Sequence, residues 1–322
     1  MDEMPSRAEV AARMDTTIAA EMLRAWALDE RAKAHVMSDP VLADMARRVA
    51  ARYVAGEDIG AAELAVRRAV GRGHDGSIEF AGESIRDRAE AIAATEVFVS
   101  LAQHVGATEI PSTVSGDLSH IGLLVSSDLV RANALRIAEA CEAVGTVFMI
   151  SAEGSDRTDA VLDVYEWLSA RTRSAGITLQ ARLHRSTADL DRLLTLPGRI
   201  RLVKGAFLEP SAVALGRDSG ELSVRYQELA ARILAAEHPL TLATHDEPLL
   251  RASLRQVDAA AVEVEMLMGL GDDLLDSLQA EGWATREYCI FGDEWWLYVL
   301  NRMAESPERV FRAIADLAPL TL

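Results

Sequence analysis

Eight short runs of apolar and β-branched residues recur along the chain after about residue 72, and amphipathic helical stretches separate them. The starts of successive runs lie between 21 and 40 residues apart. A strand, a helix and two loops need this length in a right-handed βαβ crossover. Eight such units predict an α/β fold, a (β/α)8 barrel of the TIM type. The expected strands cover residues 77–80, 109–114, 146–150, 177–181, 200–203, 240–243, 261–267 and 287–291.

Helical signals between these runs support the alternation. Residues 128–144 and 156–175 have helical spacing and are followed by Gly145 and Gly176, and residues 222–236 place apolar side chains three and four apart. A doubly wound sheet is the alternative arrangement. Because no G-x-G-x-x-G follows the first strand, the dinucleotide-binding fingerprint of that fold is missing and the barrel is favoured.

The first part of the chain has a different pattern. Residues 6–72 are rich in Ala and Arg, and apolar residues recur at helical spacing, as in the series Val10, Met14, Ile18 and Met22. We therefore expect a helical arm or subdomain over residues 1–72 and the barrel over residues 73–322.

Composition restricts the class of function. The 322 residues carry a net charge of -17 and are 50% hydrophobic, which suits a globular protein with a large buried core. The acid excess disfavours nucleic acid and anionic membrane surfaces as partners. No stretch is long and apolar enough to span a membrane, and residues 1–5 lack the features of a signal peptide, so we expect a soluble, cytoplasmic protein. Cys141 and Cys289 are expected to be small buried hydrophobes.

In a barrel, functional side chains lie where the strands end and the βα loops begin. Polar residues at these predicted ends are therefore the candidates for one shared site. They are Glu83, Asp117, Ser151, Glu153, Gln180, Arg182, Lys204, Thr244, His245, Asp246, Glu265 and Tyr288.

Residues 201–207, with the sequence RLVKGAF, form an apolar strand that ends in a basic residue and a glycine. Lys204 could reach a phosphate or another anion while Gly205 permits close backbone approach. The alternative is a strand flanked by solvated charges, and the position at a strand end favours the functional interpretation.

Three polar side chains, Thr244, His245 and Asp246, directly follow another apolar strand. Hydrogen bonding of a polar ligand by Thr244 and His245 is compatible with Asp246 capping the next helix. A metal site is disfavoured, because no second histidine with ligand spacing lies nearby. We expect no metal.

The last strand carries Tyr288, and a helix is expected to start at Gly292 or Asp293. Trp295, Arg302 and Glu305 would then lie near one face of that helix. An aromatic stripe of this kind is typical of a core. Arg302 lies among apolar residues and should pair with a carboxylate or a ligand anion.

Taken together, these motifs resemble the flavin-dependent proline dehydrogenases, including the proline dehydrogenase domain of bifunctional proline-utilisation enzymes. The motifs occur in the family's order with nearly its spacing over about residues 50–310. The matching segments are GES at 82–84, LSHIG at 118–122, AEGSDR at 152–157, LQA at 179–181, RLVKGAF at 201–207, ATHD at 243–246, EVEMLMG at 263–269, and residues 288–305.

The resemblance implies a barrel with FAD in its mouth. It also implies removal of a hydride from the carbon next to an amine nitrogen, which leaves an imine; the flavin supplies most of this chemistry and the protein orients the substrate. The positions that contact FAD in the family correspond to Gln180, Arg201, Val203, Lys204, Gly205, Thr244, His245 and Glu305. Asp246 also corresponds to a site position, where the family commonly has Asn.

The substrate pocket departs from the resemblance. In the family a Lys and two adjacent Arg grip the substrate carboxylate, with a supporting Asp. The corresponding residues here are Asp117, Asn301, Arg302 and Ser151, a set more negative than the family's by two charges. Loss of two cations should weaken proline binding by several kcal/mol, on the order of the strength of such charge pairs. We therefore expect a substrate other than, or modified from, L-proline.

Two further positions bear on this pocket. Tyr288 keeps the family's aromatic lid, whereas Arg182 replaces a Tyr and could supply a relocated anion contact. The leading hypothesis is an FAD-dependent amine or imino-acid dehydrogenase. The alternatives are a flavin-binding protein without catalytic activity, and a cofactor-free barrel lyase or hydrolase using Asp117, Glu153 and His245. The electron acceptor, with quinone or oxygen as candidates, and the oligomeric state stay open.

Overall fold

The computed structural model describes residues 7–255 and 257–317, which pack into two compact units. One unit runs from Asp58 to Phe291, and the other combines the described residues up to Glu57 with those from Gly292 onward. These units do not coincide with the expected division between residues 72 and 73. Residues 1–5, on which the expectation about a signal peptide rests, lie outside the described residues.

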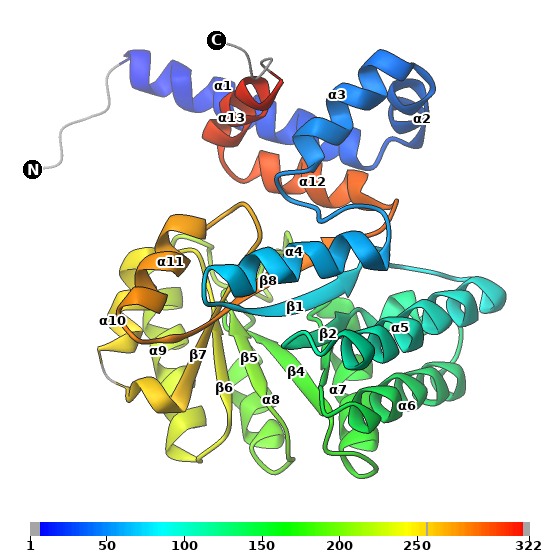
Figure 1. Ribbon diagram of the computed structural model, residues 1–322. Helices are drawn as coiled ribbons and strands as arrows, with labels where there is room; N and C mark the ends of the chain where they lie inside the picture. The colour runs from blue at the N-terminus through cyan, green and yellow to red at the C-terminus, as the bar shows by residue number, and fades with distance from the viewer. Residues whose placement is uncertain (1–6, 256, 318–322) are drawn as a thin grey trace, which may run out of the picture. The chain divides into compact units, whose positions relative to one another are not determined.

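The larger unit is a closed barrel of parallel strands in the order β1-β2-β3-β4-β5-β6-β7-β8 (Figure 1), which confirms the predicted TIM-type fold. Each of the eight predicted runs contains one strand. The strands are β1 Asp75–Phe80, β2 Ser112–Gly116, β3 Phe148–Ile150, β4 Ala175–Gln180, β5 Ile200–Val203, β6 Leu240–Ala243, β7 Val262–Leu267 and β8 Ala284–Phe291.

Helices follow the strands along the chain and surround the barrel (Figure 1). Several of them begin at a polar N-cap, as where the Asp87 carboxylate accepts hydrogen bonds from the backbone N–H groups of Ala89 and Glu90. The helices of this unit are α4 Ile59–Gly71, α5 Arg88–Thr108, α6 Ser127–Ala143, α7 Thr158–Ser169, α8 Ser186–Leu193, α9 Gly220–Ala235, α10 Glu247–Leu254 and α11 Asp272–Ala280, with 3-10 turns η1 Leu118–His120, η2 Ser155–Arg157 and η3 Ala259–Ala261.

Several predicted boundaries are wrong, including the start of β8 at Ala284 instead of residue 287, and two of the errors have a local cause. The expected strand over 109–114 begins only at Ser112, because Glu109 has a left-handed backbone (φ 52°) that terminates α5. The expected helix over 156–175 ends at Ser169. Gly176 lies inside β4 instead of closing the helix, and a Cβ atom there would lie 2.6 Å from Cε of Met149 on β3.

Helix α4 packs against β1 and β8, although the sequence pattern grouped it with the N-terminal region. Its buried face consists of Ala62, Ala65, Val66 and Ala69. A Cβ atom at Gly76 of β1 would lie 2.6 Å from Val66, so the glycine permits this close helix–strand approach. The helix thereby covers the joint between the first and last strands.

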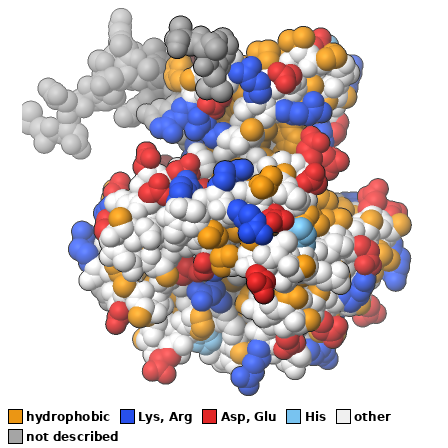
Figure 2. Space-filling view, in the orientation of Figure 1, with side chains coloured by type: hydrophobic (Ala, Val, Ile, Leu, Met, Phe, Trp, Pro, Cys, Tyr) orange, Lys and Arg blue, Asp and Glu red, His pale blue; other side chains and the backbone are white. Residues whose placement is uncertain are grey.

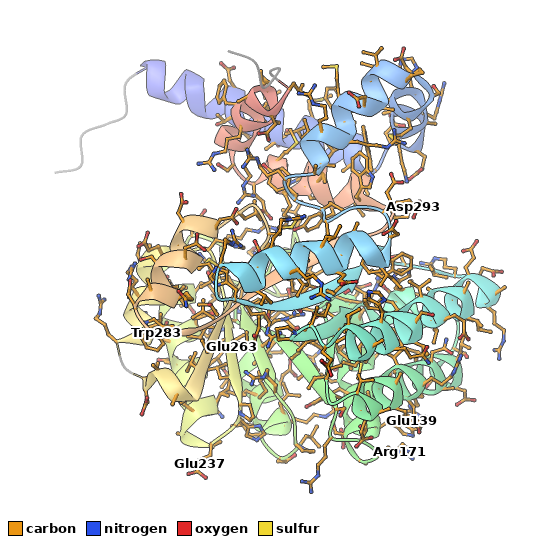
Figure 3. All side chains as sticks on the ribbon, viewed as in Figure 1. Glu139, Arg171, Glu237, Glu263, Trp283 and Asp293 are labelled. Atoms are coloured by element: carbon orange, nitrogen blue, oxygen red, sulfur yellow. The ribbon has the colours of Figure 1, made fainter. Side chains whose placement is uncertain are left out.

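Strand residues of the barrel are buried on both sides but with different chemistry. Apolar side chains such as Ile78, Val114 and Leu202 alternate with polar ones. The polar set bonds between strands that are not neighbours, for example Ser151 directly after β3 with Glu79 on β1, which requires that these side chains point into the barrel interior. Glu263 of β7 belongs to this interior set, whereas Glu237 lies in the connection before β6 (Figure 3).

The smaller unit consists of helices α1 Arg7–Ala27, α2 Glu30–Ser38, α3 Pro40–Ala50, α12 Trp295–Ala304 and α13 Pro307–Asp316. The predicted N-terminal helices are therefore present. Helix α1 packs on α12, where Nε1 of Trp296 donates to the carbonyl of Trp26 at 2.9 Å. Arg52 and Asp316 form a two-bond ion pair.

The surface charge and the apolar character of the helices can be compared with the predictions about nucleic acid and membranes. Acidic and basic side chains are intermixed over the face visible in Figure 2. In the part of the chain that the structure describes, none of the helices has both the length and the apolar character needed to traverse a bilayer. Cys141 and Cys289 are buried free thiols.

Candidate active site

Arg201 of β5 is the centre of a hydrogen-bond network inside the barrel. The residue is 4% exposed, and Nη1 donates to Oε1 of Glu265 on β7 at 3.1 Å. Nε donates to Oγ1 of Thr178 on β4 at 2.9 Å, and Nη1 also reaches Oγ of Ser115 on β2 at 3.3 Å. One guanidinium therefore joins four strands, which fixes its position.

The same guanidinium contacts two further residues in the barrel interior. Its Nη2 donates to Oγ of Ser151 at 3.4 Å, and its central carbon lies 5.0 Å from the ring centroid of Tyr288 on β8. This geometry is a cation–π contact. Ser151, which follows β3, and Tyr288, which lies inside β8, are thus brought together with Arg201 in the barrel interior.

Glu79, near the end of β1, was missed by the sequence analysis. Oγ of Ser151 donates to its Oε2 at 3.0 Å. Burial raises the pKa of Glu79 to about 7, although Arg201 and the Ser151 hydroxyl oppose the rise. The signal that could have found it is the alternation in residues 77–80, Ser-Ile-Glu-Phe, where polar residues occupy every second position.

Asp117 directly follows β2. Burial raises the pKa of its carboxyl well above the usual range, and the negative charge of Glu79 raises it further. Among the described residues, none donates a hydrogen bond to this carboxylate, and it does not cap η1. Asp117 and Glu79 therefore form an acidic region near the strand ends that receives one hydrogen bond from the described residues, the one from Ser151.

Gln180, the last residue of β4, is 5% exposed. Its Nε2 donates to the carbonyl of Glu153 at 2.8 Å, which fixes the amide orientation, and its Oε1 is buried without a hydrogen-bond partner. A Cβ atom at Gly205 would lie 3.2 Å from this oxygen. Because a buried carbonyl without a donor is costly, this oxygen is suited to accept from a bound ligand.

Gly205 has a φ of +111°, in the region that side chains other than glycine rarely adopt. A Cβ atom there would also lie 2.7 Å from Cγ of Arg182. The predicted need for a glycine after Lys204 thus has a steric cause, because the backbone passes close to both neighbouring side chains.

Arg182 does not have the arrangement expected for an anion contact. Its Nε and Nη2 donate to the carbonyl of Leu215 at 3.1 and 2.8 Å, and Nη1 donates to the carbonyl of Phe207 at 2.6 Å. Arg182 is 5% exposed, and its guanidinium joins its own loop after β4 to the loop after β5. The structure gives no support to a relocated substrate contact there.

Lys204 and Asp246 form an ion pair, with Nζ 2.8 Å from Oδ2. Asp246 also caps α10 through Leu249, as predicted. Burial alone would raise the pKa of Asp246, but the hydrogen bonds from Lys204 and from the Leu249 N–H together lower it. Lys204 therefore lies at the carboxyl end of β5, where it already pairs with the Asp246 carboxylate.

Thr244 and His245 each accept a hydrogen bond from a backbone N–H group, one in their own loop and one at the end of β7. Oγ1 of buried Thr244 accepts from the N–H of Asp246 at 3.2 Å, and Nε2 of His245 accepts from the N–H of Leu267 at 3.1 Å. Val203 precedes Lys204 and accepts at its carbonyl from the N–H of Ala181. In the described ranges no group of three or more His, Cys, Asp or Glu side chains has metal-binding geometry.

Glu153, proposed as an acid or base of a cofactor-free enzyme, is 3% exposed and satisfied by the protein. It accepts from the N–H of Ser119 at 2.9 Å and from Nη1 of Arg157 at 2.9 Å. Arg157 in turn donates to Oγ of Ser84. These bonds link the loops after β1, β2 and β3, so the role of Glu153 in the structure is to hold these loops together.

The remaining predicted residues lie on α12 in the smaller unit. The helix begins at Trp295 and not at Gly292 or Asp293. Arg302 pairs with Glu305 at 2.8 Å, so the expectation that Arg302 meets a carboxylate is confirmed. Glu305 also pairs with Arg309, and Asn301 precedes Arg302 on the same helix.

The fold and these strand-end groups define a class, a barrel enzyme whose ligand groups come from the carboxyl ends of parallel strands. Residues 62–305 match the proline dehydrogenase family. The chain belongs to this family, whose enzymes are FAD-dependent flavoprotein oxidoreductases.

Two curated relatives illustrate the similarity. A proline dehydrogenase of Deinococcus radiodurans is 32% identical over 286 residues, which cover 84% of this chain and 92% of the relative. Proline dehydrogenase 2 of Bacillus subtilis is 27% identical over 269 residues, 82% of this chain and 88% of the relative.

Solved structures share the fold at lower identity. Proline utilization A from Bdellovibrio bacteriovorus, inactivated by N-propargylglycine, superimposes with a TM-score of 0.78 at 17% identity and covers 95% of this chain. The corresponding protein of Bradyrhizobium japonicum gives 0.69 at 20% identity and covers 82%. This chain spans 38% and 31% of those two longer chains.

Proposed function

We propose that the protein is an FAD-dependent dehydrogenase that removes a hydride from the carbon next to an amine nitrogen, with a substrate other than, or modified from, L-proline. Membership of the proline dehydrogenase family over residues 62–305 carries the reaction type. The substrate part depends on Asp117, which takes the place of a carboxylate-binding Lys in the family it resembles. The two curated relatives are named as proline dehydrogenases. L-proline is therefore the substrate against which other amines should be compared for this chain.

The residues present fit FAD. The unpartnered Oε1 of Gln180 is a buried acceptor, and Gly205 leaves room at the backbone where a side chain would clash. Lys204 can balance a phosphate, and Arg201, Val203, Thr244, His245 and Asp246 complete the proposed contact set of the barrel. The proposed role of Glu305, which belongs to the other unit, rests on the family resemblance alone. When bound, FAD supplies an acceptor for the hydride and its two electrons.

The protein's own groups have the following roles in this proposal. Tyr288 packs over the small ring or alkyl chain of the substrate, and its ring is oriented by the contact with Arg201. Ser151 orients the Glu79 carboxylate through a 3.0 Å hydrogen bond. Asp117 meets the substrate amine or a second polar group. Arg302 remains the one clamp cation in the sequence pattern.

Charge balance requires a proton acceptor. Loss of a hydride from the carbon and of a proton from the nitrogen forms the C=N bond, and only a neutral amine can donate the hydride readily. Glu79, with a pKa of about 7, has the basicity of a group that can accept the proton near neutral pH. Small amines in water are protonated at this pH, so such an acceptor favours the reactive form.

The test is the absorbance spectrum of the purified protein, followed by anaerobic bleaching of bound flavin across a panel of amines and amino acids. We expect flavin bands, and reduction by an amine faster than by L-proline. Proline as the best reductant would refute the altered substrate. A yellow protein that no amine reduces would indicate flavin binding without catalysis.

Absence of flavin bands would point instead to the cofactor-free alternative. That result should then be accompanied by no gain in thermal stability on added FAD. Glu139→Gln on the exposed face of α6 is the matched control for handling and concentration, because the residue lies far from the strand ends (Figure 3).

A further inference from the structure

Carboxylates outnumber available cations at the carboxyl ends of the barrel strands. Each basic side chain of this region already has an acceptor in the protein. Arg201 bonds Glu265, Lys204 bonds Asp246, Arg157 bonds Glu153, and Arg182 bonds two backbone carbonyls. An incoming anionic group would therefore have to displace one of these contacts.

Glu79 and Asp117 are in the opposite situation. Glu79 receives one hydrogen bond, from the neutral hydroxyl of Ser151. Asp117 receives none from the described residues. The charged groups that act on the pair are Arg201, which favours ionisation, and Glu83, Glu153 and Glu265, which oppose it. A carboxylate pair with so little compensation attracts a positively charged group.

A separate observation indicates that this end of the barrel receives a ligand. Gln180 is 5% exposed, yet its Oε1 has no donor while its Nε2 is fixed on the Glu153 carbonyl. The carboxylate pair thus lies at strand ends that already present a buried acceptor for a bound molecule. The negative charge of this pair can then discriminate between ligands of opposite charge.

We infer that Asp117, supported by Glu79, is the specificity-determining residue and selects an amine that carries a second positive charge, or no charge, where an amino acid has its carboxylate. The substrate class is a cyclic or secondary amine bearing an aminoalkyl group, of which 2-(aminomethyl)pyrrolidine is the simplest proline-like member. This inference rests on the proposed amine dehydrogenase function, and it specifies the substrate of that same site.

The recognition step transfers no electrons and breaks no covalent bond. The ammonium of the side group donates hydrogen bonds to the Asp117 carboxylate, and the ring nitrogen remains free to react. Where the carboxylate pair holds a proton, binding of the cation releases that proton to solvent. A carboxylate in the same place would lie beside Asp117 and be repelled.

A matched pair of unreactive ligands tests the inference on the FAD-loaded protein. In 2-(aminomethyl)oxolane and oxolane-2-carboxylate an ether oxygen replaces the ring nitrogen, so neither can form an imine, and the two differ in the sign of the side group. Calorimetric titration measures both dissociation constants. We expect the aminomethyl ligand to bind at least tenfold more tightly than the carboxylate.

Substitutions then assign the preference to the carboxylate. Asp117→Asn preserves shape and should reduce the ratio of the two affinities at least tenfold, and Asp117→Lys should reverse the preference. Glu79→Gln is the second variant and should reduce the ratio by a smaller factor. Glu139→Gln, on the exposed face of α6, should leave the ratio unchanged. Tight binding of the carboxylate by the wild type, or an unchanged ratio in Asp117→Asn, would overturn the inference.

The outcome is distinguishable from failure of the proposed function. If amines bleach the flavin but the aminomethyl compound has no advantage over L-proline, the dehydrogenase assignment survives and the charge selection fails. If no amine bleaches the flavin, the proposed function itself fails, whatever the two oxolanes show.

Discussion

Substitution of Glu79 by Gln should change how the stability of the protein depends on pH. The pKa of this carboxyl is about 7 in the folded chain, because burial raises it, against a usual value of 4.5. Below both values the carboxyl is protonated in the folded and unfolded chains, and above both it is ionised in each. Between them the folded chain binds more protons, so the free energy of unfolding falls as pH rises.

The size of the effect follows from the two pKa values. A carboxyl whose pKa moves from 4.5 to about 7 on folding lowers the free energy of unfolding by about 3 kcal/mol across that pH range. Glutamine has nearly the same shape, can still accept the Ser151 hydroxyl, and does not titrate. The variant should therefore gain about 3 kcal/mol relative to the wild type between pH 4.5 and pH 7.

Removal of Glu79 also removes one of the charges that raise the pKa of Asp117. This second effect has the same sign, so it adds to the relative gain. The assay is urea-induced unfolding at half-unit pH intervals from 4.5 to 8.5, with Glu139→Gln as an exposed control. Parallel pH profiles for the wild type and Glu79→Gln would refute the reasoning that burial in the folded chain sets this pKa.

Three further substitutions test individual contacts. Arg182→Met should destabilise the fold by about 3 kcal/mol, because the Leu215 carbonyl and a second carbonyl lose charged donors, and it should leave the preference between ligand charges unchanged in calorimetry. Gly205→Ala should lower the melting temperature and the flavin content of the purified protein, since its Cβ would lie 2.7 Å from Arg182; normal flavin content would contradict this. Asp246→Asn should tighten FAD binding severalfold in a fluorescence titration, because Lys204 loses the carboxylate that competes with phosphate; weaker binding would count against a phosphate contact for Lys204.

The repeat of short apolar runs was sufficient to predict the barrel and one strand in each of its eight expected places. Such runs reflect burial under helices, a local requirement that sequence records directly. Boundaries were less predictable. Glu109 and Gly176 have backbone or packing roles that depend on neighbouring strands, and Ile59–Gly71 packs on β1 and β8 although its pattern resembles that of the preceding helices.

The candidate site residues also include some whose positions the sequence predicted and some whose positions or partners it did not. The predicted strand ends place Asp117, Ser151 and Gln180 correctly at the carboxyl ends of β2, β3 and β4, whereas Tyr288 lies inside β8. Glu79 was missed because it lies one residue before the end of its strand. Arg182 was given an anion contact because it follows a predicted strand and replaces a Tyr of the family, yet its partners are carbonyls of Phe207 and Leu215, which no pattern within residues 175–182 indicates.

The amino-acid sequence by itself determined the order of strands and helices, the motifs of the proline dehydrogenase family and the excess of acid at the strand ends. The tertiary structure decided which charges are satisfied. Arg201 reaches Glu265 two strands away and Ser115 three strands away, and these contacts exist because the sheet closes with a particular register. Closure leaves Asp117 and Glu79 without an ion-pair partner of their own among the described residues, and the substrate preference that we propose depends on that difference.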